Sequence, residues 1–113
     1  MNNSTFQSQS PLNVAEVIAC LRERWGVSYD LQLIVRKDCL YLHIMWAYLE
    51  QQSFPINEEK YREHLNEVLE IINRLGLADD VRQWMKIVGP RPRIGRALSL
   101  KLKGGELLKE FVL

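Results

Sequence analysis

The chain has 113 residues and a formal net charge of +1, with 47% hydrophobic and 26% charged residues. This length suits one domain whose core needs no metal or disulfide, and the composition excludes a disordered chain. No apolar run reaches the roughly 18 residues that cross a bilayer, so we expect no transmembrane segment. Residues 1–10 lack the basic start and apolar core of a secretory signal, and we expect them to form a flexible tail.

The first expected element is an amphipathic helix that opens at Ser10 and Pro11 and ends at Gly26. Because apolar residues recur at helical spacing along it, one side is expected to face the core. That stripe consists of Val14, Val17, Ile18, Leu21 and Trp25.

Two strands are expected next, joined by a tight turn at Lys37 and Asp38. Residues 27–36 alternate apolar and polar side chains, which predicts a half-buried strand. Residues 39–46 are apolar on both faces, so we expect them to form the central strand, covered on both sides. Residues 47–52 fit either the end of this strand or a helical turn.

Two helices follow. Asn57 predicts the cap of a long helix that ends at Gly76, and its glutamates mostly occupy one side, interpreted as a solvated face rather than an acidic docking surface. A shorter helix is expected from Asp79 to Val88. The apolar sides are Tyr61, Leu65, Val68, Leu69, Ile72 and Leu75 in the first, and Val81, Trp84, Ile87 and Val88 in the second.

A third strand is expected at 97–103, where leucines alternate with Ser99, Lys101 and Lys103, as in an edge strand that lysines protect. Residues 104–113 are expected to be a C-terminal tail able to form a short helix. The sequence therefore predicts a single α+β domain over 11–103, in the order α-β-β-α-α-β. Its small antiparallel or mixed three-stranded sheet is covered by helices, and the partner of the third strand stays open.

Charge is distributed unevenly along the chain. Residues 50–80 hold eight acidic and three basic residues, whereas residues 81–113 hold eight basic and two acidic ones. The stretch 82–103 has no acid at all, and Pro90 and Pro92 stiffen its centre. We predict a binding surface there for an anionic partner, with Trp46 as an aromatic contact. Its basic residues are Lys86, Arg91, Arg93, Arg96, Lys101 and Lys103, with Arg82 at the start of the stretch.

Three explanations of these bases stay open. They neutralise the acidic 50–80 segment within the fold, or they bind an acidic protein, or they bind RNA or another anionic ligand such as lipid. Among external partners, an acidic protein is preferred to nucleic acid.

The sequence shows no pattern typical of catalysis. It lacks a phosphate-binding glycine loop and the HExxH and GxSxG motifs. Cys20 and Cys39 have no CxxC spacing and no histidine at ligand distance, so we expect reduced thiols, no metal and a cytoplasmic location. We assign no catalytic residue and no cofactor.

Two histidines leave a small enzyme as an alternative. His43 shares a strand face with Tyr41 and Met45, and either a hydrogen-bonded core histidine or an acid-base residue working with Tyr41 or Tyr48 fits that position. His64 is expected on the surface of the acidic helix.

Four segments carry a resemblance: YDLQL at 29–33, LYLHIMWAYLEQQSFP at 40–55, YREHL at 61–65 and PRIGRALSL at 92–100. The chain resembles, over about residues 11–103, a domain family of unknown function found in cyanobacteria and in chloroplast proteins of plants and algae. The resemblance implies a small α+β protein of a photosynthetic cell, located in the cytoplasm or, for plastid relatives, the stroma. It implies no activity and no catalytic residues.

Overall fold

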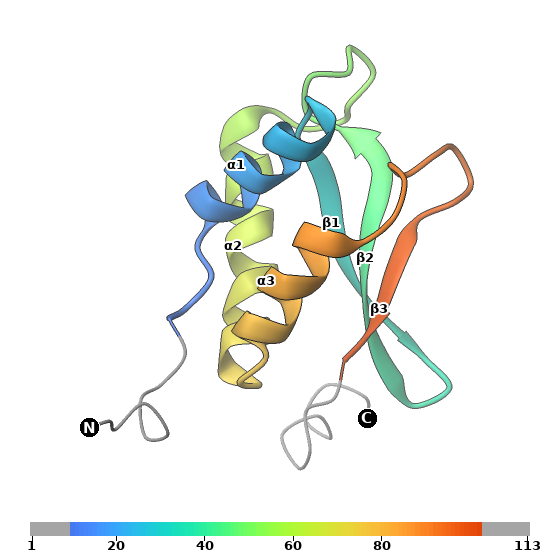
Figure 1. Ribbon diagram of the computed structural model, residues 1–113. Coiled ribbons are helices and arrows are strands. Elements are labelled where there is room, and N and C mark those ends of the chain that lie inside the picture. The colour runs from blue at the N-terminus through green and yellow to red at the C-terminus, as the bar shows by residue number, and fades with distance from the viewer. Residues whose placement is uncertain (1–9, 103–113) are drawn as a thin grey trace.

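Three helices and three strands form in the order α1 (Val14–Trp25), β1 (Tyr29–Arg36), β2 (Cys39–Tyr48), α2 (Glu58–Arg74), α3 (Ala78–Ile87) and β3 (Leu98–Lys101) (Figure 1). The computed structural model describes residues 10–102. The strands make one antiparallel sheet in the order β1-β2-β3, so the predicted α+β class and element order are confirmed. Residues 1–9 of the N-terminal tail expected over 1–10, the whole C-terminal tail expected over 104–113, and Lys103 lie outside the described residues.

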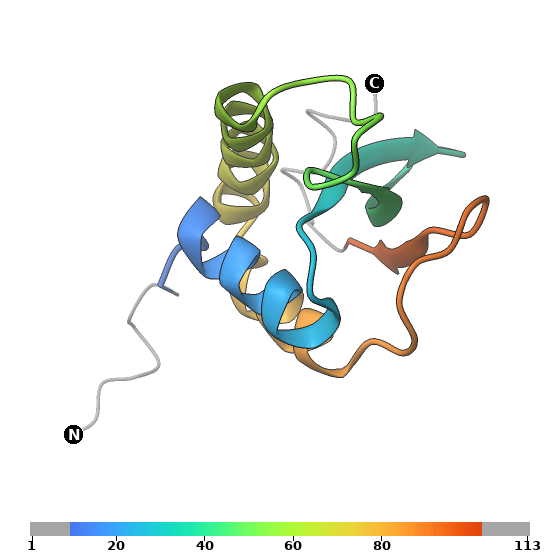
Figure 2. The same cartoon turned by 90° about the horizontal axis from the view of Figure 1, so that it is seen from above.

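The helices lie together on one side of the sheet (Figure 2). Alternate strand residues face them and are buried, among them Leu31, Leu42 and Ile44 at 0% exposure. The predicted stripe of α2 packs against them: Tyr61, Leu65, Val68, Leu69, Ile72 and Leu75 are all buried. The core therefore lies between the layer of helices and the sheet.

The β1–β2 turn has the form that a two-residue hairpin favours. Lys37 and Asp38 both have positive φ, at 53° and 63°, as the right-handed twist of a tight hairpin requires. Arg36 pairs with Cys39 and Gln32 with His43 across the two strands. The predicted turn is confirmed, and the remaining ambiguity is resolved because β2 continues as strand to Tyr48.

β2 is the central strand, as predicted, but the expected cover on both faces is wrong. Tyr41 and His43 are only half-buried, and they point away from the helices because their neighbours Leu40 and Leu42 point toward them. The aromatic and methionine content of this face suggested burial. The three helices all lie on the other face of the sheet (Figure 2). Tyr41 and His43 are therefore left partly exposed to solvent.

The first helix begins later than predicted. Asn13, rather than Ser10, caps α1, and its side chain accepts a hydrogen bond from the Glu16 amide at 2.8 Å. Leu12 is held before the helix by Asn73 of α2, which accepts from the Leu12 amide and donates to its carbonyl. The end at Gly26 is confirmed, with a left-handed φ of 84°.

In α3 the inward side differs from the predicted one. Ala78, Val81 and Met85 are buried, whereas Ile87 is 76% exposed. The spacing from Val81 to Met85 is one helical repeat, so Ile87 falls on the far side of the helix. Trp84 and Val88 flank the buried stripe and are half-buried. Across residues 10–102, no helix combines the length and the apolar character that crossing a membrane requires.

Candidate functional site

The acid-free stretch contains a small hairpin, here called the arginine hairpin (residues 91–96). The Arg93 amide donates to the Arg96 carbonyl at 3.1 Å, and the Arg96 amide donates back at 2.7 Å. Gly95 has φ 78°, which a turn of this kind needs at its third position and which a side chain would strain. Ile94 occupies the other tip position and is 89% exposed, so an apolar side chain stands in solvent between two arginines.

The base of the arginine hairpin is anchored to the core. Pro92 is buried, and the Arg91 Nε donates to the Tyr29 hydroxyl at 3.1 Å. Tyr29 itself is 2% exposed and makes edge-on ring contacts with Trp25 and Tyr48, at centroid distances of 5.8 and 5.7 Å. Arg91 therefore has a structural contact, and the hairpin projects from a rigid base.

The chain before the hairpin is held in the same way. Arg24 of α1 donates to the carbonyls of Met85 and Val88, at 3.1 and 2.6 Å, and so satisfies groups that the end of α3 leaves without helical partners. Its guanidinium also lies 4.6 Å from the centroid of the Trp25 ring. The chain that leads from α3 into the arginine hairpin is consequently held at Val88 and again at Arg91 and Pro92.

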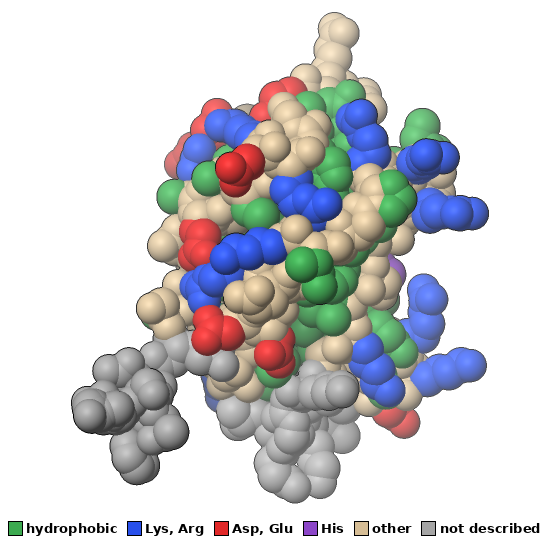
Figure 3. All heavy atoms as spheres, in the orientation of Figure 1, with side chains coloured by type: hydrophobic (Ala, Val, Ile, Leu, Met, Phe, Trp, Pro, Cys, Tyr) green, Lys and Arg blue, Asp and Glu red, His purple; other side chains and the backbone are tan. Residues whose placement is uncertain are grey.

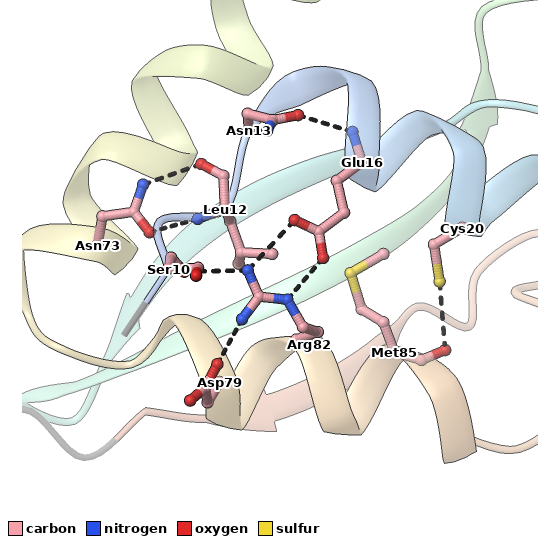
Figure 4. A network of polar contacts seen from close by, with 9 residues as sticks. All are labelled: Ser10, Leu12, Asn13, Glu16, Cys20, Asn73, Asp79, Arg82 and Met85. Carbon is pink, nitrogen blue, oxygen red and sulfur yellow. Dashed lines mark hydrogen bonds and ion pairs between the residues drawn. The ribbon is translucent and has the colours of Figure 1, made fainter. Parts of the chain in front are cut away.

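Internal neutralisation explains Arg82 but not the hairpin. Arg82 donates to both carboxylate oxygens of Glu16, at 2.5 and 3.2 Å, and also to Asp79 and to the Ser10 carbonyl (Figure 4). Within residues 10–102, neither Arg93 nor Arg96 forms an ion pair. These two arginines therefore form no ion pair with the 50–80 segment, whereas Arg82 pairs with Asp79 of that segment and with Glu16 of α1.

The acidic side of α2 is a solvated face, as predicted. Glu58 pairs with Arg62 at 2.9 Å and Glu63 with Lys60 at 3.8 Å, all on the same helix. Lys and Arg side chains stand out instead along the right-hand side of Figure 3, over the loop that precedes β3 and near the β1–β2 turn. The molecule thus presents a basic side next to its sheet.

The remaining predicted residues divide between two places. Lys101 is exposed on β3, directly across from Tyr41 of β2. Trp46 is half-buried. It follows Ile44, which pairs with Leu98 at the start of β3, so Trp46 lies at the end of the sheet nearest the arginine hairpin. Lys86 is elsewhere: it lines a groove of about 250 Å³ between α1 and α3, together with Glu16 and Glu23.

His43 lies on the uncovered sheet face. Its ring makes an edge contact with Tyr41, with 6.5 Å between the centroids, and its strand neighbours are Gln32 and Ser99. Partial burial, and the positive charge of Arg36, lower the pKa of His43 below its usual value. No carboxylate of the described chain hydrogen-bonds to it, and no cluster of metal-ligating side chains occurs between residues 10 and 102.

His64 has a role that the sequence did not indicate. Its Nε2 lies 2.7 Å from the Leu31 carbonyl, which can only accept, so this nitrogen carries the proton. The same nitrogen is 3.5 Å from Asp30, whose pKa is raised because burial disfavours its charge more than His64 favours it. The contact joins α2 to β1. The one sequence feature that indicates it is the position of His64, about one helical turn after the core residue Tyr61.

The comparisons with known proteins agree with this fold. A family model described as a domain of unknown function, DUF3067, matches residues 15–112. The solution structure of the Alr2454 protein from the cyanobacterium Nostoc sp. strain PCC 7120 is similar, with 38% sequence identity and a TM-score of 0.79. The match covers 90% of this chain and 98% of the Nostoc chain. No curated protein matches the chain.

Proposed function

We propose, from the premise that the chain belongs to the DUF3067 family of domains of unknown function, that it is a non-enzymatic interaction module. Its arginine hairpin binds an acidic surface of a partner protein. The observation that carries the proposal is Ile94, 89% exposed between Arg93 and Arg96, two arginines without an internal ion pair in the described chain. We place it in the cytoplasm of a photosynthetic cell, or in the stroma for plastid relatives.

The physical argument concerns both charge and preorganisation. A guanidinium donates two parallel hydrogen bonds to one carboxylate, which favours Asp and Glu clusters as targets. Ile94, 89% exposed beside these charges, adds apolar area that a partner would remove from water on binding. Because Pro92 and Arg91 hold the base of the hairpin, little conformational entropy is lost when it binds.

RNA is the second candidate, and the uncovered sheet face favours it. Tyr41 and His43 present rings there next to the exposed Lys101. Aromatic rings on an open sheet can stack with unpaired bases while lysines neutralise phosphates. Binding of this kind would weaken steeply as salt concentration rises, and absence of any binding to single-stranded RNA at low salt would exclude it.

The test is capture of partners from a nuclease-treated cyanobacterial lysate with the immobilised protein. The double variant Arg93→Glu and Arg96→Glu should recover about tenfold less partner than the wild type, because two attractive contacts become repulsive. The matched control, Arg36→Glu and Lys37→Glu, reverses two charges at the other end of the sheet. Equal recovery by all three proteins would refute the proposal.

A further inference from the structure

The two edges of the sheet differ in how they are covered. Along β1, the Tyr61 hydroxyl of α2 donates to the Tyr29 carbonyl at 2.8 Å, and His64 donates to the Leu31 carbonyl at 2.7 Å. Side chains one helical turn apart thus satisfy carbonyls two residues apart on the outer side of this strand. The β1 edge is closed to any further strand.

Within residues 10–102, the β3 edge is open. The Leu102 amide donates to the Leu40 carbonyl at 2.9 Å, so Leu102 and, by alternation, Leu100 direct their amides and carbonyls toward β2. Ser99 and Lys101 therefore direct theirs outward. Both residues are exposed, and no strand of the described chain pairs with β3 on that side.

An apolar hollow accompanies this edge. A pocket of about 190 Å³ is lined by three leucines and two charged residues: Leu77, Leu100, Leu102, Asp80 and Lys101. Figure 3 shows hydrophobic side chains along the same side of the molecule, between α3 and β3. A strand added beside β3 would direct every second side chain toward this apolar side and the others toward Ser99 and Lys101.

We propose that the open edge of β3 receives an extended segment of an acidic partner protein as a fourth strand, in which acidic and apolar side chains alternate. The apolar ones lie over Leu98 and Leu100, and the acidic ones lie beside Lys101 and the arginine hairpin, which directly precedes β3. The inference rests on the proposed function, since it specifies how the acidic partner is held.

Charge decides between an acidic partner and a second copy of this chain. Two β3 edges pairing with each other would bring together two copies of Lys101 and two arginine hairpins. Like charges across neighbouring strands destabilise the pairing, and an exposed lysine on an edge strand is a common protection against it. An acidic segment reverses the sign of each of these contacts.

The probe is a short synthetic peptide in which Glu and Val alternate, and the control peptide has the same residues in two blocks. Amide hydrogen exchange of the full chain, followed by NMR, should slow at Ser99 and Lys101 when the alternating peptide binds. Ser99→Pro removes an outward amide without touching the bonds to β2, so it should weaken binding about tenfold, whereas Ser99→Thr should not. Unchanged β2 amide signals establish that the proline variant folds.

Three results would overturn the inference. If the peptide binds but exchange at Ser99 and Lys101 is unchanged and Ser99→Pro binds normally, the fourth strand is excluded. If the double variant Arg93→Glu and Arg96→Glu binds the peptide more weakly in that same experiment, the proposed function is still supported. If the alternating peptide does not bind, or if Ser99 and Lys101 already exchange slowly in the free protein, the edge is not a site for such a segment.

Discussion

Arg82 leaves α3 and meets Glu16 of α1 with two hydrogen bonds, at 2.5 and 3.2 Å, while its side chain is only 16% exposed. We predict that Arg82→Met lowers the free energy of unfolding by about 1–3 kcal/mol, because this two-point contact and the bond to Ser10 are lost together. Urea denaturation measures the change. Lys86→Met on the same helix is the control and should change stability by less than about 0.5 kcal/mol.

The loss of unfolding free energy caused by Arg82→Met should also depend on pH. The hydrogen bonds from Arg82 lower the pKa of Glu16 below its usual value, so the folded protein favours the ionised carboxylate. That stabilisation is present above the unfolded-state pKa of Glu16 and is lost as pH falls through the folded-state pKa. The difference between wild type and Arg82→Met should therefore shrink in acid, and a difference that stays constant would contradict this assignment.

Asp30 shows the opposite sign. Its pKa is raised because burial disfavours the charge, and its Oδ1 has no hydrogen-bond partner. The protonated form is therefore favoured on folding, a stabilisation present below the unfolded-state pKa and lost as pH rises through the folded-state pKa. Asp30→Asn should therefore gain unfolding free energy relative to wild type as pH rises above the unfolded-state pKa of Asp30. Asp38→Asn, in the exposed turn, is the control, and a flat difference for Asp30→Asn would contradict the prediction.

At the scale of elements, α2 closes the outer edge of β1 through Tyr61 and His64. Tyr61 is fully buried, and its burial raises the pKa of the hydroxyl, so the group remains a donor at any ordinary pH. Tyr61→Phe keeps the ring but leaves the Tyr29 carbonyl without this donor, and we expect a loss of about 1–2 kcal/mol in urea denaturation. Tyr41→Phe, on the uncovered face, should have no effect, and a similar loss there would show that the hydroxyl bond is not the cause.

Most elements were predictable because their signals are local. Asn57 caps α2, Gly26 ends α1 and Lys37 begins the β1–β2 turn, as the sequence predicts, since each depends on a few neighbouring residues. The start of α1 was not, because Ser10 and Asn13 are both good caps, and a tertiary bond from Asn73 to Leu12 decides between them. The prediction that Ile87 faces inward was wrong for a related reason. The sequence near a helix end does not show whether another element packs against an apolar residue there.

At the scale of the molecule, the charge gradient predicted the region of the candidate site but not its membership. Sequence alone could not separate Arg82, which is held by Glu16, from Arg93 and Arg96, because the separating contacts join residues far apart in the chain. Likewise Lys86 belongs to the same acid-free stretch but faces Glu16 and Glu23 across a groove between two helices. The tip at Ile94 is exposed because the chain turns there, with Gly95 at a positive φ.

The open β3 edge also bears on whether the protein associates with itself. Lys101 is exposed on the outer side of a strand whose neighbours Leu98 and Leu100 are apolar, which is the arrangement by which lysines keep edges from pairing. The variant Lys101→Val should therefore associate with itself. Its sedimentation coefficient, measured by sedimentation velocity, should rise with protein concentration. Lys101→Arg keeps the charge and should sediment as the wild type does. An open edge that has become apolar should pair with the same edge of a second copy. If the sedimentation coefficient of Lys101→Val does not change with concentration, the charge of Lys101 is not what prevents this pairing.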